Sequence, residues 1–403
     1  MVDQTLAKYL NELRILTMLR TQGPASRADI ARRLGVTPAT STRLINGLIE
    51  RDLLEESRGL SSKVKDELRE PGRPGGRVSL NPGGAFFLGV EIGVGVIRFA
   101  VIDLIANVVD SSEISVSREL PPSAAVAAIS NQLSLVEKQR KFKSKIMSVG
   151  VTVPGIVTSE GYVINLPILG WKSTDLLAEL SAAIPLPCFV ENNANAAAFG
   201  AVYTQPSLPS VCTIFLKLGT GCGGAAVING RLLRGASGTA GEFGHIRLSD
   251  DGALCSCGQK GCLESWVNLG ALARNYLGTD KLTESEFAAL PAEVAEKASE
   301  GDEKALSALD TFSHWMSLGI VSLINLFNPS AVILGGVMRP VLERTVDQIR
   351  DGVQAGIISG IPIPEVRLSE LGKFECAIGA ATIAHHHAFD ISRVEIHEHE
   401  LQP

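Results

Sequence analysis

One histidine and three cysteines in a short glycine-rich stretch constrain the fold of this chain more than any other feature. Residues 241–264 contain His245, Cys255, Cys257 and Cys262, with glycines between the cysteines that free the backbone to curl. Tetrahedral zinc prefers such nitrogen and sulfur ligands, and a site whose four positions are all filled by protein is structural rather than catalytic. The spacing therefore predicts one structural Zn²⁺ per chain. The alternative is a glycine-rich loop with three reduced cysteines and no metal.

Length and cysteine content indicate several domains in a reducing compartment. A chain of 403 residues is expected to form two or three domains. Its seven cysteines are an odd number, and the first ten residues have no signal-peptide pattern, so a disulfide framework is not indicated. No run of about twenty apolar residues is present, so we expect a cytoplasmic protein without a membrane span. The remaining thiols are expected in the core: Cys188, Cys212, Cys222 and Cys376.

The charge is distributed unevenly along the chain. The net charge is −6, but residues 1–82 hold 14 Lys and Arg against 10 Asp and Glu, so they carry +4 and the remainder carries −10. A basic amino-terminal module on an acidic body indicates a polyanionic partner for that module alone. The excess is small, so charge by itself favours DNA binding only slightly.

The same residues show the spacing of a helix-turn-helix. Leucines at positions 6, 10, 13, 16 and 19 recur three or four apart, which predicts a first helix. Ser26 is the expected N-cap of a second helix over 27–34, which Gly35 ends. Thr37 and Pro38 are typical of the start of a third helix, predicted to run to about Arg51. Two helices joined by a short glycine turn are the signature of this motif.

We expect the third helix and a following hairpin to contact DNA. Short polar side chains and an arginine suit base edges and phosphates, and the predicted set on the exposed face is Thr40, Ser41, Arg43 and Asn46. Strands over 53–56 and 77–80 would form a wing, whose basic Gly-Pro tip carries Arg73 toward the minor groove. The alternatives are an ordinary solvated helix face and, for Arg73, a flexible linker.

The rest of the chain alternates strands and helices, which predicts an α/β body. Two hairpins begin its two halves, over 86–92 with 96–103 and over 210–217 with 223–228. The other predicted elements are helices at 123–141, 302–327 and 340–357, strands at 145–151 and 331–336, and loops at 165–167 and 361–364.

Five segments of the body resemble the ROK family of repressors, open reading frames and sugar kinases. They are Gly150–Val157, Leu166–Trp171, Val190–Ala198, Leu218–Gly224 and Gly241–Glu264, and the resemblance extends over roughly residues 80–390. It implies a winged helix-turn-helix over residues 1–82 followed by two ribonuclease-H-like α/β lobes, as in the sugar kinases. The lobes would comprise residues 83–200, completed by 375–392, and residues 201–374. A sugar would bind in the cleft between them.

The resemblance also implies which side chains contact the sugar: Asn192, Asn193, Glu242, His245 and Glu264. His245 can ligate zinc through one ring nitrogen and donate a hydrogen bond through the other. The alternative for Glu242 and Glu264 is that they only orient the metal ligands. Pro167-Ile168-Leu169 stands where the kinases tend to have Pro-Asn-Leu, which leaves the identity of the sugar open.

Two departures from the kinase pattern argue against catalysis. The kinases have an aspartate as general base where this chain has Asn193, and an amide cannot accept the hydroxyl proton at neutral pH. Their first phosphate turn reads Asp-x-Gly-Gly-Thr, whereas residues 91–96 read Glu-Ile-Gly-Val-Gly-Val. We therefore expect sugar binding without phosphorylation.

The sequence thus predicts a transcriptional regulator, a repressor whose binding to double-stranded operator DNA responds to a sugar or sugar phosphate. One such module reads too few base pairs to select a single operator in a genome, so we expect a homodimer or a dimer of dimers. The subunit contacts are expected from the helices within 302–357. The alternatives are a sugar kinase with a fused DNA-binding module and a repressor that answers to a protein partner.

Overall fold

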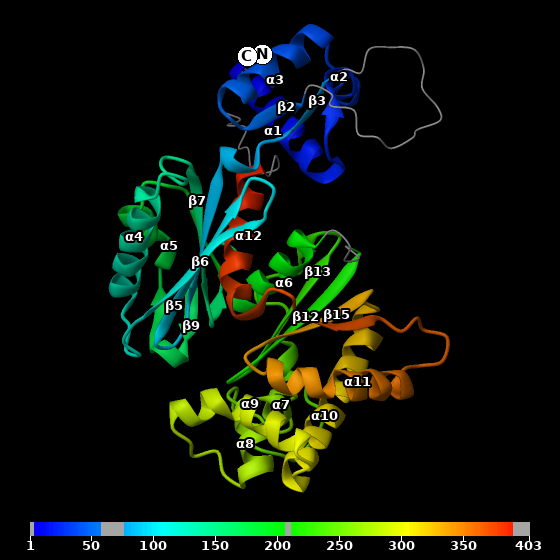
Figure 1. The fold of residues 1–403 in the computed structure, drawn as a ribbon. Coiled ribbons are helices and arrows are strands. Elements are labelled where there is room, and N and C mark those ends of the chain that lie inside the picture. The colour runs from blue at the N-terminus through cyan, green and yellow to red at the C-terminus, as the bar shows by residue number, and fades with distance from the viewer. Residues whose placement is uncertain (1–3, 58–75, 206–210, 390–403) are drawn as a thin grey trace.

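The computed structural model describes residues 4–57, 76–205 and 211–389. It shows an amino-terminal module seated on two α/β lobes, with one long helix running between the lobes toward that module (Figure 1). The combination of a winged module with an α/β body confirms the predicted fold class. None of the helices in these ranges is long and apolar enough to span a membrane.

The amino-terminal module has three helices and a three-stranded sheet of order β1-β3-β2. The helices are α1 (Gln4–Gln22), α2 (Arg27–Leu34) and α3 (Pro38–Glu50), and the strands are β1 (Ala25–Ser26), β2 (Leu54–Ser57) and β3 (Arg77–Leu80). The capping predictions are confirmed: the Ser26 and Thr37 side chains accept hydrogen bonds from the backbones of Asp29 and Thr40, and Gly35 is left-handed with φ 71°. The two-residue strand β1, which pairs with β3, was not predicted.

The first lobe is built on a five-stranded sheet of order β11-β7-β4-β5-β6. Its strands are β4 (Phe86–Ile92), β5 (Val96–Asp103), β6 (Val108–Ser115), β7 (Ile146–Val153) and β11 (Cys188–Asn192). Helices α4 (Pro122–Lys138) and α5 (Leu176–Ala183) belong to this lobe, and Figure 1 shows both on the side of the sheet away from the lobe interface. The hairpin β4–β5 and the strand β7 agree with the prediction, whereas β6 was not foreseen.

A small sheet at the edge of the first lobe corrects one prediction. It has the order β10-β9-β8, formed by β8 (Ile156–Val157), β9 (Val163–Leu166) and β10 (Trp171–Thr174). Asn165 and Leu166, predicted as part of a loop, belong to β9, where Leu166 pairs with Trp171 and is fully buried. The burial of this apolar pair stabilises the strand, and the following proline ends it because proline lacks a backbone N–H.

The second lobe contains a five-stranded sheet of order β14-β13-β12-β15-β16. Its strands are β12 (Cys212–Leu218), β13 (Cys222–Ile228), β14 (Arg231–Leu232), β15 (Ala331–Gly336) and β16 (Glu365–Leu368). Its helices are α7 (Glu264–Val267), α8 (Leu269–Leu277), α9 (Glu284–Ser299), α10 (Glu303–Phe327) and α11 (Arg339–Gly356). The predicted helices near 302–327 and 340–357 and the strand at 331–336 are confirmed.

Two helices connect the lobes, α6 (Asn193–Thr204) and α12 (Glu375–Phe389). Gly200 of α6 approaches Gly379 of α12 so closely that a Cβ at Gly200 would lie 2.8 Å from the Gly379 Cα. A Cβ at Gly89 or Gly150 would overlap the backbone of α12, so glycine in β4 and β7 lets this helix pack directly on the first sheet. The four remaining cysteines are buried, as predicted.

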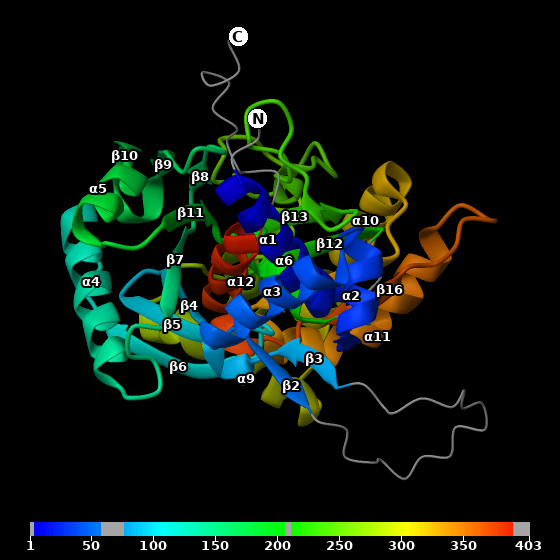
Figure 2. The same ribbon diagram turned by 90° about the horizontal axis from the view of Figure 1, so that it is seen from above.

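The amino-terminal module contacts the body at the carboxyl end of α12. Figure 2 shows α1 above this end of the helix, and the Arg20 guanidinium lies 4.3 Å from the centre of the Tyr203 ring of α6. The Lys145 ammonium donates to Asp52 Oδ2 at 2.7 Å and to the Gly83 carbonyl at 2.8 Å. Buried apolar residues of both parts, among them Leu16 and Phe87, form one continuous cluster. The module is therefore packed against the body and not merely tethered to it.

Candidate functional site

The histidine and three cysteines converge as their spacing predicts. The potential ligand atoms of His245, Cys255, Cys257 and Cys262 all lie within 4.8 Å of one another. The Sγ atoms of Cys257 and Cys262 are 3.7 Å apart, and Cys255 Sγ is 3.4 Å from His245 Nδ1. Sulfurs about 2.3 Å from a tetrahedral zinc would be roughly 3.8 Å apart. The cluster therefore has the composition and dimensions to hold a metal ion of this kind.

The two nitrogens of His245 face different groups. Nδ1 is directed at the thiol of Cys255, whereas Nε2 lies 3.9 Å from Glu242 Oε2. A backbone hydrogen bond from Gln259 lowers the pKa of the Cys257 thiol. His245 can therefore ligate a metal through Nδ1 and present Nε2 to whatever lies beside Glu242.

All five side chains predicted to contact a sugar line one cavity of about 520 Å³, which we call the ligand cleft. The first lobe and α6 contribute Asn192 and Asn193, and the second lobe contributes Glu242, His245 and Glu264. The remaining walls are largely apolar or glycine, with Ile156 and Ile168 on the side of the small sheet. A volume of this size is ordinary for a small-molecule site.

The five residues are not equally free to bind a ligand. The Asn192 side chain caps α6: Oδ1 accepts from the backbone N–H groups of Ala194 at 2.8 Å and Asn195 at 3.2 Å, and Nδ2 donates to the Gly155 carbonyl at 2.8 Å. Asn193 is half-buried and makes no side-chain hydrogen bond among the described residues. Asn193 therefore keeps its whole amide for a ligand, and Asn192 keeps one N–H.

Glu264 is also largely committed, although it lines the cleft. Its side chain is buried, Oε2 accepts from the Cys222 backbone N–H at 2.9 Å, and Oε1 accepts from the Ser256 hydroxyl at 2.6 Å. Glu242, in contrast, has a side chain that is 54% exposed. Glu264 thus holds the metal loop against the turn at 219–222, while Glu242 is the freer carboxylate.

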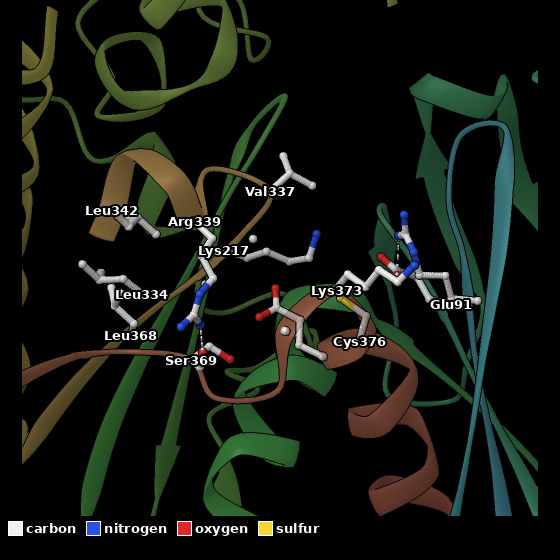
Figure 3. Close-up of a pocket in the computed structure, with 15 residues that line it drawn as sticks. Glu91, Lys217, Leu334, Val337, Arg339, Leu342, Leu368, Ser369, Lys373 and Cys376 are labelled. Atoms are coloured by element: carbon white, nitrogen blue, oxygen red, sulfur yellow. Dashed lines mark hydrogen bonds and ion pairs between the residues drawn. The ribbon is translucent and has the colours of Figure 1, made fainter. Parts of the chain in front are cut away.

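One of the cleft residues that the sequence did not predict is Lys217, next to the last residue of β12 (Figure 3). Lys217 precedes the Gly219-Thr220-Gly221 turn by two residues, and that position was the signal that could have been used. Among the described residues, it is the one lysine that lines the cleft.

The exposed side of α3 differs from the prediction at one position. A hollow of about 750 Å³ is lined by Thr42, Arg43 and Asn46 together with Glu50 and, from α1, Lys8. Ser41, predicted to be exposed, is 1% exposed, and its hydroxyl donates to the Arg27 carbonyl at 3.4 Å. Ser41 lies three and four residues before the buried Leu44 and Ile45, so it shares their inward face. The prediction of an exposed Ser41 is wrong.

Thr40 and Asn46 have partners within the module. Thr40 Oγ1 lies 3.0 Å from Thr37 Oγ1 at the start of α3. Asn46 Oδ1 accepts from Arg27 Nη1 at 2.9 Å, and Arg27 also donates to both carboxylate oxygens of Glu56 in β2, at 2.9 and 3.0 Å. This chain of contacts fixes the Asn46 amide and links α3 to the strands of the wing. Arg73 lies outside the described residues.

The class of protein is defined by a winged helix-turn-helix module on a body of two α/β lobes. A ligand cleft lies between the lobes, and a metal-type cluster lies in the second lobe. Residues 87–387 match the ROK family, and residues 8–63 match the MarR family, which agrees with a winged amino-terminal module. The chain belongs to the ROK family, which confirms the resemblance noted in the sequence.

Similar proteins include both regulators and kinases. The xylose repressor of Bacillus spizizenii is 26% identical over 394 residues, which cover 97% of this chain and 99% of the repressor. A glucokinase from Streptomyces griseus, solved with glucose and AMPPNP, is 30% identical with a TM-score of 0.64, covering 75% of this chain and all of the kinase. A ROK family transcriptional regulator, a homologue of the E. coli MLC protein, shares the fold with a TM-score of 0.76 and 24% identity over 95% of this chain and 97% of its own.

Proposed function

We propose that this protein is a sugar-responsive transcriptional repressor of carbohydrate metabolism that binds operator DNA and does not phosphorylate its ligand. The observation that carries this proposal is the presence, in one chain, of a winged module packed on α12 and a cleft lined by the five expected sugar contacts. The similarity to the xylose repressor spans nearly the whole chain, whereas the glucokinase matches the body alone.

Two features of the cleft oppose phosphoryl transfer. Asn193 stands at the position of the general base, and the loss of a general base typically costs about 10²–10⁴ in rate. At the first phosphate turn, the Glu91 carboxylate accepts from Arg98 Nη1 at 3.2 Å, so it is held in an ion pair rather than left free for a metal ion. A sugar can still bind through Asn193, Glu242 and His245, because binding needs neither a general base nor a free carboxylate at Glu91.

The metal cluster would hold one structural Zn²⁺. With His245, Cys255, Cys257 and Cys262 as ligands the coordination shell is closed, so the ion would fix the loop rather than act on the ligand. Zinc bound at Nδ1 would leave the Nε2 proton of His245 to donate a hydrogen bond to the sugar. Metal and sugar would thus stabilise the same loop.

The DNA interface would centre on α3. Arg43 and Asn46 carry the hydrogen-bonding groups suited to guanine and adenine edges, and Glu50 can accept from a cytosine amino group. Lys8 of α1 and Thr40 would contact phosphates, and Arg73 would reach the minor groove. A homodimer or dimer of dimers, using helices of the second lobe, would place two modules on inverted half-sites of an operator in the cytoplasm.

The DNA module would sense the cleft through α12. In this proposal residues 1–82 form the DNA-binding module, and the lobes 83–200 (with 375–392) and 201–374 close on the sugar. Because α12 packs on the first sheet and on α6, and its end contacts α1, a change in lobe angle would move the two modules of a dimer relative to each other. A coupling of about 1–3 kcal/mol, or roughly 5–150-fold in operator affinity, is usual for such switches.

Two measurements on the full-length protein test the proposal. A thermal-shift screen of sugars and sugar phosphates should identify a stabilising ligand, because a ligand that binds only the native state raises stability. That ligand should then change operator affinity in fluorescence anisotropy. Turnover of ATP with the identified sugar would instead favour a kinase with a fused DNA-binding module. The absence of any stabilising sugar, together with operator binding, would favour a repressor that answers to a protein partner.

A further inference from the structure

A run of positive charge interrupts the acidic body at the end of the first lobe that lies next to the amino-terminal module. Residues 138–145 lead from the last residue of α4 to β7 and contain five cations and no acidic residue, although residues 83–403 together carry −10. We call this segment the basic loop, and its cations are Lys138, Arg140, Lys141, Lys143 and Lys145. Figure 1 shows α4 and β7, which flank the loop, in the lobe below the module. Such a local reversal of charge indicates a polyanionic partner.

The backbone of the basic loop is fixed by hydrogen bonds and by one buried aromatic ring. The N–H groups of Phe142 and Lys143 donate to the Gln139 carbonyl at 3.0 and 3.1 Å, and that of Lys145 donates to the Phe142 carbonyl at 3.0 Å. The Phe142 ring is 1% exposed and packs edge-on against Phe86, with 4.9 Å between the ring centres. An ordered loop loses little conformational entropy when its side chains bind a ligand.

Most cations of the basic loop are available to a partner. The exposed ones are Lys138, Arg140, Lys141 and Lys143. Within the part of the chain that the structure describes, none of these four side chains forms an ion pair or donates a hydrogen bond. Lys145 differs, because its ammonium is held by Asp52 of the module. Exposed cations without acidic partners can neutralise the phosphates of a nucleic acid and release its counterions.

Two contacts of Lys145 place the basic loop beside the DNA-binding module. Its ammonium donates to Asp52, two residues after the end of α3, and its carbonyl accepts from the N–H of Phe86 at 2.8 Å, at the start of β4. The basic loop therefore lies near the carboxyl end of α3. A duplex read by α3 continues beyond the base pairs in contact with this helix and carries one negative charge per about 1.7 Å of its axis. Phosphates of the flanking duplex would pass close to the basic loop.

We propose that the basic loop is a second DNA contact, through which the body binds phosphates of the duplex beside the site that α3 reads. This inference rests on the proposed DNA binding and extends the interface from the module to the first lobe. Phosphate contacts carry no sequence information, so the loop would add affinity and orient the body on the duplex without adding base preference.

The salt dependence of DNA binding by the full-length protein tests this contact. The probe is a random-sequence duplex of about 40 base pairs, which extends beyond two half-sites one helical turn apart. The measured quantity is the slope of log K against log salt concentration, which changes by about 0.9 for each phosphate neutralised. Lys138→Gln/Lys143→Gln should reduce the magnitude of this slope by about 1–2, and adding Arg140→Gln should reduce it by about one more. Affinity at about 0.1 M salt should fall roughly tenfold or more in the double variant.

A matched control removes the same charge from the second lobe. Lys281→Gln/Lys304→Gln changes two exposed lysines there and should leave the slope as in the unaltered protein. Both double variants should melt at the temperature of the unaltered protein, because all four side chains are exposed. An equal loss of slope in the two double variants would overturn the proposal, since it would show an effect of net charge alone.

Hydroxyl-radical footprinting locates the contact on a duplex selected for binding from a random pool. The variant Lys138→Gln/Lys143→Gln should lose protection of the sugars that flank the central site and keep protection at that site. Loss of central and flanking protection together would overturn the proposal, because it would show that the loop supports the fold of the module rather than contacting DNA.

The same experiments distinguish failure of this inference from failure of the proposed function. If the unaltered protein binds the duplex and the loop variant has the same salt slope, only the loop contact is wrong. An unchanged slope with an altered sedimentation coefficient would assign the basic loop to a contact with the acidic body of a second copy instead. If the unaltered protein binds no duplex, the DNA-binding function and the loop contact are both contradicted.

Discussion

The Tyr203 hydroxyl lies 2.8 Å from Nδ1 of His385, and this contact joins the two helices that connect the lobes directly beneath the DNA-binding module. His385 Nε2 is 3.0 Å from the Leu104 carbonyl, and the Arg20 guanidinium of α1 stacks on the Tyr203 ring. A tyrosine of α6, a histidine of α12 and an arginine of α1 thus meet at one point. These contacts therefore connect α6 and α12 to α1.

Tyr203→Phe should weaken the coupling between ligand and operator. The substitution keeps the ring under Arg20 but removes the hydrogen bond to His385, so operator affinity without ligand should change little. The ligand-induced change in affinity should shrink by about 0.5–2 kcal/mol, the range for residues that modulate coupling between sites. Anisotropy titrations with and without the sugar measure this difference. Tyr276→Phe, on α8, serves as the control, and an equal effect there would argue against a specific route.

Cys257→Ser should remove the metal and destabilise the loop at 241–264. Loss of one of four ligands opens the zinc shell, and the binding free energy of a structural ion contributes directly to folding. Elemental analysis of freshly purified protein should show one zinc per chain in the unaltered protein and much less in the variant. Cys188→Ala, which changes a buried thiol outside the cluster, should keep the metal. If elemental analysis finds no metal in the unaltered protein, the assignment of these residues as a zinc site is contradicted.

Arg43→Ala and Asn46→Ala should affect DNA binding in different ways. Arg43→Ala should weaken operator binding by about 1–3 kcal/mol, the usual contribution of a bidentate base contact. Asn46→Ala should relax the preference at one base pair more than it lowers overall affinity. Glu56→Gln should also partly relax this base preference. The Glu56 carboxylate holds Arg27, and Arg27 in turn fixes the Asn46 amide. Binding to randomised operators measures these preferences, with Arg140→Ala on the body as the control.

Asn193→Asp alone should not produce an efficient kinase. The new carboxylate could accept a proton, but the turn at 91–96 would still lack the threonine of the kinases, and Glu91 would still be paired with Arg98. A coupled assay for ADP release with the identified sugar measures the outcome. Efficient ATP-dependent phosphorylation by this single variant would show that the phosphate turn is intact in function.

His385 should make the stability of the protein depend on pH. Burial lowers the pKa of His385 to about 3, so the folded protein keeps this ring neutral where the unfolded chain, with a pKa near 6.5, binds a proton. The contribution of His385 to stability is therefore lost progressively as the pH falls from about 6.5 toward 3, by about 1.4 kcal/mol per pH unit. The free energy of unfolding, measured in urea titrations, should therefore fall less steeply with decreasing pH in His385→Asn than in the unaltered protein. If it falls equally steeply in both proteins, the prediction is contradicted.

Local signals were enough to locate much of the fold and of the site. Ser26, Gly35 and Thr37 place the helix ends of the DNA-binding module because caps and left-handed glycines act within a few residues. The cysteine spacing likewise located the metal-type cluster, whose four residues lie close together in the chain. Ser41 could also have been placed correctly, since its helical spacing from Leu44 and Ile45 assigns it to the buried face.

The sequence by itself therefore determined the domain order, the helix boundaries of the winged module and the cluster of His245 with three cysteines. Only the tertiary structure decided that the Asn192 side chain caps α6 and that the Tyr203 hydroxyl meets His385. The last two residues are 182 positions apart in the chain. Contacts over such distances depend on how the lobes pack, because burial and pairing are properties of the assembled core and leave no periodic trace in the sequence.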